Sequence, residues 1–164
     1  MASSTRTDAQ LRPSVLDRLI APTGSARLSS LETIGLRDLY ESVARDLDWL
    51  LNTKRWLPDP LENFPEADES ILTYGLPDLS IYSWRNHADA VSICRLLEET
   101  IRRFEPRLRA RTVQVRPLPG GDVDDFRLRF RIDAMLVVDP IRAPVSFDTE
   151  VDLGASGIRV RGAL

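Results

Sequence analysis

Cysteine and histidine are almost absent from this 164-residue chain, which contains one of each, Cys94 and His87. A single cysteine excludes a disulfide within the chain and a zinc site built on several cysteine ligands. A single histidine excludes the His-x-x-x-His spacing of many metal sites. We therefore expect no metal, and we expect side-chain packing to hold the fold together.

Long apolar runs are also missing. No stretch approaches the roughly 20 apolar residues that a membrane-spanning helix needs, and the N-terminal residues 1–8 lack the apolar core of a signal peptide. We therefore expect a cytoplasmic protein with no direct membrane insertion. The formal net charge of −3 argues against a protein whose whole surface binds nucleic acid.

Candidate catalytic groups are sparse as well. If Cys94 and His87 share a helix, their separation of seven positions corresponds to a rise of roughly 10 Å, too far for a hydrogen bond between a nucleophile and its base. Gly120 and Gly121 lack the lysine and helix that a phosphate-binding loop requires. We therefore expect no cofactor, no catalytic residue and no enzyme activity.

A cell-wall glycoside hydrolase is the alternative that the carboxylates leave open. Such an enzyme needs only two carboxyl groups at a set separation in a cleft. The proline-rich connection between the two predicted helices carries four candidates: Glu62, Glu66, Asp68 and Glu69. Acidic residues are common in solvated loops, so their presence alone does not indicate a lysozyme-like site.

Residues 1–12 are polar and aperiodic, which predicts a flexible tail before a single domain over 13–164.

Two segments of this domain have the apolar periodicity of amphipathic helices. From Gly35 to about Asn52, apolar residues recur at three- and four-residue steps. A second helix is predicted to begin near Asn86 or Ala88 and to end before Pro106.

The C-terminal half indicates a sheet. Thr112–Arg116 is a short predicted strand, and residues 126–138 alternate between apolar and charged side chains. After a turn containing Pro140 and Pro144, residues 145–153 alternate with the opposite parity. Ile158 and Val160 could add a last strand.

An antiparallel pairing in which residue numbers sum to 279 gives these two strands one wholly apolar face. On the other face the same register pairs three arginines with three acids: Arg127 with Asp152, Arg129 with Glu150 and Arg131 with Asp148. We therefore predict an α+β fold, with two main helices packed on a small, mostly antiparallel sheet that includes a C-terminal β-hairpin.

The segment from Ile101 to Arg111 is the densest basic stretch. It could serve a nucleic-acid-binding adaptor through residues 102–111, or it could be a solvated helix end whose arginines complement the helix dipole. Within it, Glu105, Pro106 and Arg107 place a proline between opposite charges. We expect this corner to hold both charges in a stiff, outward geometry suited to a partner protein.

Several motifs together resemble the TssE family, the baseplate wedge subunits of the type VI secretion system, which are related to the small wedge protein of contractile phage baseplates. The resemblance rests on four segments: Ser14–Leu19, Leu50–Arg55, Ser70–Asp78, and the Glu-Pro-Arg signature within Ile101–Leu108. It extends from about Ser14 to the C-terminus.

The resemblance implies a structural protein in a heteromeric assembly, in a baseplate docked at the inner membrane. Its implied partners are the TssF and TssG wedge subunits, the TssK adaptor and the sheath proteins TssB and TssC. Carried over to this chain, Glu105, Pro106 and Arg107 would contact TssF–TssG. The C-terminal hairpin would offer an edge strand to sheath segments, which would help to start sheath assembly.

Overall fold

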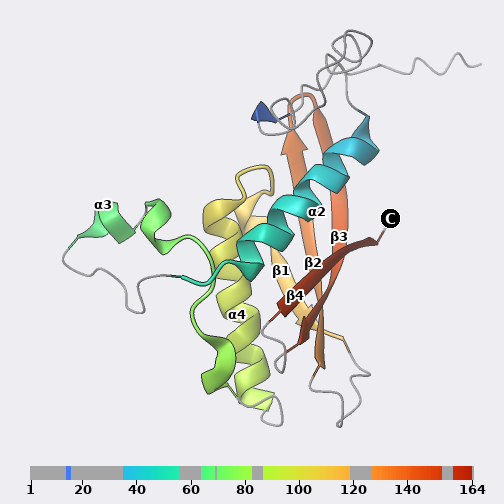
Figure 1. Ribbon diagram of the computed structural model, residues 1–164. Helices are drawn as coiled ribbons and strands as arrows, with labels where there is room; N and C mark the ends of the chain where they lie inside the picture. The colour runs from blue at the N-terminus through green and yellow to red at the C-terminus, as the bar shows by residue number, and fades with distance from the viewer. Residues whose placement is uncertain are drawn as a thin grey trace, which may run out of the picture.

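The computed structural model describes residues 14–15, 35–55, 64–68, 70–82, 87–118, 127–152 and 157–163. In these residues two long helices lie on one side of a four-stranded antiparallel sheet (Figure 1), which confirms the α+β prediction. The predicted tail and most of the Ser14–Leu19 segment lie outside the described residues. The assignment of residues 13–164 to one domain stays a prediction.

Both predicted helices are confirmed. Helix α2 spans Leu36–Asn52, and its first turn is closed by the Gly35 N–H, which donates to the Asp38 carboxylate at 2.9 Å. Helix α4 spans His87–Phe104 and ends two residues before Pro106, which cannot continue a helix. Each helix buries its apolar stripe, because that is the face it turns toward the sheet.

The sheet has the strand order β1-β2-β3-β4, with β1 at Gln114–Pro117, β2 at Arg127–Val138, β3 at Ile141–Asp152 and β4 at Gly157–Ala163. The predicted register is confirmed along the whole hairpin, since Leu128 pairs with Val151 and Ile132 with Phe147. The last strand predicted at Ile158 and Val160 is also confirmed as β4.

Strand β3 begins at Ile141, earlier than predicted. Pro144 therefore lies within the strand and not in the turn. Pro144 pairs with Met135, whose carbonyl faces the opposite side of β2 and accepts a hydrogen bond from the Arg109 N–H at 2.9 Å. Pro144 therefore sits at a position that donates no hydrogen bond to β2, where a missing N–H costs nothing.

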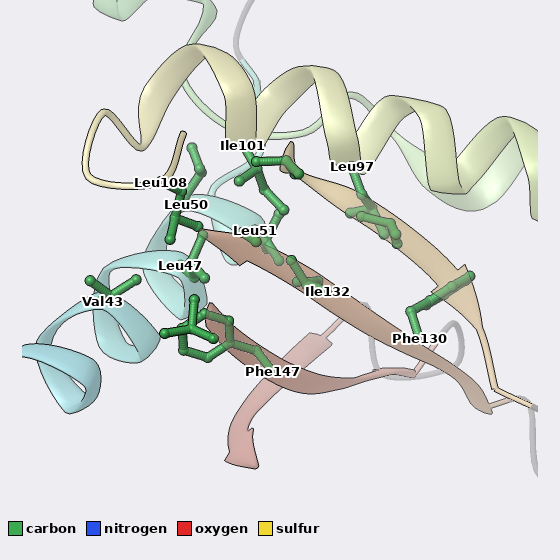
Figure 2. Packing of buried hydrophobic residues seen from close by; sticks show 14 of the residues in the cluster. Val43, Leu47, Leu50, Leu51, Leu97, Ile101, Leu108, Phe130, Ile132 and Phe147 are labelled. Carbon is green, nitrogen blue, oxygen red and sulfur yellow. The ribbon is translucent and has the colours of Figure 1, made fainter. Parts of the chain in front are cut away.

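The core lies between the helices and the sheet. Figure 2 shows Val43 and Leu47 of α2 close to Phe147 of β3, and Leu97 of α4 above the sheet. All four side chains have no solvent exposure. Tyr40 adds a stacked ring against Phe147, with centroids 4.7 Å apart. Burial of this kind stabilises a fold by about 1.5–3 kcal/mol per large apolar side chain.

The connection between the helices is less irregular than predicted. Its described parts form a short helix α3 at Pro65–Asp68 and two 3-10 turns, η1 at Ile71–Thr73 and η2 at Leu79–Ile81. Gly75 has a φ of 101°, which L side chains rarely adopt. The backbone beside it bonds to the end of α2, with the Leu76 N–H donating to the Thr53 carbonyl at 2.9 Å.

Candidate functional site

The segment that follows α4 returns along strand β2. The Val137 N–H donates to the Arg107 carbonyl at 2.8 Å, and Leu108 forms an isolated bridge with Leu136. The next residues form the 3-10 turn η3 at Ala110–Thr112 and lead into β1. The Glu105-Pro106-Arg107 corner is therefore held by the sheet on its C-terminal side and by α4 on its N-terminal side.

The side chain of Arg107 is the centre of a polar network. Its Nε donates to Oε1 of Glu105 at 2.7 Å, and its Nη2 contacts the other Glu105 oxygen at 2.5 Å. The same Nη2 lies 2.6 Å from Oδ2 of Asp46, and Nη1 donates to the Ser42 hydroxyl at 3.2 Å. The network thus joins the corner to α2, a segment 61 residues earlier in the chain.

The expected outward geometry of the two charges is wrong. Glu105 is only 3% exposed, and the Arg107 side chain, 21% exposed, points at α2. Proline restricts the backbone of the corner, but it does not decide where the side chains go. The acids of α2 and the buried Glu105 carboxylate decide that, because an isolated buried charge would be far more costly than a paired one. Pro106 itself remains exposed.

The electrostatics of this network agree with its geometry. Burial alone would lower the pKa of Arg107, but hydrogen bonds and charges from Glu105 and Asp46 outweigh burial and raise the pKa above its ordinary value. Burial, followed by the charges of Asp46 and Glu105, also raises the pKa of Tyr74. Arg107 therefore stays charged over the whole physiological pH range.

The sheet edges bear on the implied strand addition. Strands β2 and β3 are both internal, so the edge expected in the hairpin of residues 126–153 lies instead at β4. Side chains of α2 already bond to part of that edge. Asn52 exchanges two hydrogen bonds with Ile158, at 2.6 and 2.8 Å, and Asp48 accepts from the Val160 N–H at 3.1 Å.

The opposite edge is covered in the same way by α4. The Val115 N–H donates to Oε1 of Glu98 at 2.9 Å, and Nη2 of Arg102 donates to the Val113 carbonyl at 2.7 Å. Side chains that bond to an edge prevent it from pairing with another chain. Arg102 and Arg107 are thus both used inside the domain, which removes two arginines from the suggested nucleic-acid patch of residues 102–111.

The other candidate chemical groups are not brought together. Cys94 is 7% exposed, as predicted for a core residue, and burial and the Glu98 charge raise its pKa to about 11. His87 begins α4. Glu66 is exposed on α3, whereas Glu62 and Glu69 lie outside the described residues. Within the described ranges, no three His, Cys, Asp or Glu side chains are grouped as metal ligands.

Sequence reasoning missed several residues that matter in this structure. Ser42 and Asp46 complete the Arg107 network, and Asp48 and Asn52 cover the β4 edge. In the sequence they read as the polar face of an amphipathic helix. A partial signal was present, because Asp48 and Asn52 are four residues apart on one face of the helix.

The family described as baseplate wedge protein gp25 matches residues 37–141, from the start of α2 to the start of β3. Comparisons with curated proteins and with solved structures give no significant match. None of the helices in the described residues is long and apolar enough to cross a membrane. Because this match covers more than half of the chain, the chain belongs to the gp25 family of baseplate wedge proteins.

Proposed function

We propose that this chain is the TssE-like wedge subunit of a type VI secretion baseplate, where it binds TssF–TssG and helps to start assembly of the contractile sheath. Membership of the gp25 family supports a structural role in a baseplate. The observation that carries the finer proposal is the preorganised corner at Glu105-Pro106-Arg107, which has an exposed proline at its tip.

Preorganisation favours this corner as a docking site. Three attachments hold it: the Arg107 network to α2, the hydrogen bonds to β2, and the end of α4. A surface that is already ordered loses little conformational entropy when a partner binds. Pro106 and the exposed fifth of the Arg107 side chain are available for contact. Exposed apolar atoms beside an arginine are typical of binding hot spots.

The role in sheath assembly is proposed for the end of β4. Beyond Val160, no side chain of the described residues bonds to the outer edge of this strand. A strand from TssB or TssC could add there by main-chain hydrogen bonding. In this proposal the protein acts in the cytoplasm, near TssK, in a baseplate docked at the inner membrane.

Replacing Pro106 with glutamate tests the wedge contact. The substitution adds bulk and charge at the exposed tip without removing a partner of the Arg107 network. We expect the affinity for purified TssF–TssG to fall by about tenfold or more. Ser92→Glu is the matched control, because Ser92 is exposed on α4 and lies roughly 18 Å along the helix from Phe104.

Binding should be measured by biolayer interferometry, with circular dichroism to verify that both variants are folded. Equal affinities for Pro106→Glu and Ser92→Glu would remove the corner from the interface. Failure of the unsubstituted chain to bind TssF–TssG would overturn the proposed function itself.

A further inference from the structure

The outer face of the sheet, which points away from α2 and α4, carries an excess of arginine. Alternation along the strands places six arginines and three acids on this face among the described side chains. They are Arg116, Arg129, Arg131, Arg142, Arg159 and Arg161, with Asp133, Asp148 and Glu150. The whole chain has a formal net charge of −3, so this face opposes the overall charge of the protein.

The charges are arranged in rows across the strands. In one row Glu150 of β3 lies between Arg129 of β2 and Arg159 of β4. In the next row Asp148 lies between Arg131 and Arg161. Asp148 and Glu150 therefore each have an arginine on both sides, at an inter-strand spacing of about 4.8 Å.

Only part of this charge is neutralised within the domain. Arg131 pairs with Asp148 at 2.8 Å, and Arg116 pairs with Asp133 at 2.6 Å. The side chains of Arg129, Arg159 and Arg161 are exposed and form no hydrogen bond or ion pair with the described part of the chain. Arg159 and Arg161 are two residues apart on one strand, so their α-carbons lie about 7 Å apart.

Apolar side chains border the arginines on the same face. Met135 and Val137 of β2 are half-buried, and Pro144 of β3 is exposed. Met135 pairs with Pro144, and Val137 lies two residues further along β2, so the three lie next to one another near the turn between β2 and β3. Arginine and methionine beside exposed apolar atoms form a composition that is enriched in protein interfaces.

We propose that this arginine face binds an acidic segment of a partner protein, one that presents carboxylates on alternate residues to Arg159 and Arg161. Guanidinium groups bind carboxylates through two parallel hydrogen bonds, which gives such a contact direction as well as charge. An extended segment repeats its side chains every two residues, the same period as β4. The contact uses the face of the sheet, so the α2 side chains on the β4 edge need not move.

A patterned protein surface fits this face better than a nucleic acid does. Asp148 and Glu150 run through its middle, and a phosphate backbone crossing the strands would meet them as like charges. A protein segment that runs along β4 can place its carboxylates over Arg159 and Arg161 without covering the acids of β3. The inference does not depend on which member of a baseplate supplies the segment.

Nuclear magnetic resonance with the full ¹⁵N-labelled chain tests the inference directly. The probe is a synthetic peptide of alternating glutamate and threonine, added at low salt, and a lysine–threonine peptide and single-stranded DNA form the comparison arms. We expect the glutamate peptide to shift the side-chain resonances of Arg129, Arg159 and Arg161. The double variant Arg159→Glu with Arg161→Glu should weaken binding by about tenfold or more.

The matched control is Arg95→Glu with Arg111→Glu, which makes the same charge change at exposed positions on α4 and η3. This control should change the affinity by less than about twofold. Equal losses of affinity in both double variants would mean that the peptide is attracted to any exposed arginine, and would overturn the inference. Tighter binding of DNA than of the glutamate peptide at the same resonances would overturn it in favour of a nucleic-acid surface.

Discussion

Replacing Arg107 with alanine should lower the free energy of unfolding by about 3 kcal/mol. The substitution leaves the Glu105 carboxylate, whose side chain is only 4% exposed, with the backbone N–H of residue 107 as its one remaining donor among the described residues. Breaking a buried ion pair by removing one partner costs about 3–5 kcal/mol. The lower end applies here, because the Arg107 side chain is 21% exposed and Asp46 can turn to water.

Urea denaturation followed by tryptophan fluorescence measures the effect, since the chain contains three tryptophans. In thermal unfolding the same loss corresponds to a fall of roughly 6–12 °C in Tm for a protein of this size. Arg109→Ala is the matched control, because Arg109 is exposed two residues away and no side-chain contact is described for it. This control should stay within about 0.5 kcal/mol of the unsubstituted protein.

A double-mutant cycle isolates the pair. Adding Glu105→Gln to Arg107→Ala removes the stranded charge, so the double variant should be more stable than the sum of the two single changes predicts, by about 2 kcal/mol. The reasoning is refuted if Arg107→Ala costs less than about 1 kcal/mol, or if it costs no more than Arg109→Ala.

Three further substitutions test other parts of the fold. Gly75→Ala would place a Cβ 2.2 Å from the Thr53 carbonyl oxygen, at a residue whose φ is 101°. Calorimetry should therefore show that the free energy of unfolding falls by more than about 2 kcal/mol. A change within experimental error would contradict this geometry. Hydrogen bonding to a serine and an arginine lowers the pKa of Asp133, so its stabilisation is present above its unfolded pKa of about 4 and is lost as the pH falls through the folded value. Asp133→Asn should therefore flatten the acid limb of a pH–stability profile, and an unchanged limb would refute the linkage. Asn52→Ala should expose the β4 edge at Ile158, which lowers the free energy of unfolding by about 1–2 kcal/mol and increases self-association in sedimentation velocity. A sedimentation profile equal to that of the unsubstituted chain would show that Asn52 does not protect the edge.

Local periodicity in the sequence determined much of this structure. The apolar spacing gave α2 and α4 their bounds to within a residue or two, since each helix needs one apolar stripe to pack. The hairpin register also followed from the sequence. A slip by two residues would keep the apolar face but place only two of the three arginines opposite acids, whereas the observed register pairs all three.

Other features depended on residues that are distant in sequence. The direction of the Arg107 side chain was wrongly predicted, because its acidic partner Asp46 lies on α2, far away in the sequence, and no local pattern connects the two. The covering of the β4 edge by Asn52 likewise spans 106 residues.

Periodicity reports which side of an element is buried, and the sequence by itself therefore determined the helices, the strands and the faces they bury. Periodicity does not report which polar groups meet once the elements pack. For that reason only the tertiary structure decided that Glu105 and Arg107 pair internally, and that both edges of the sheet are held by helix side chains.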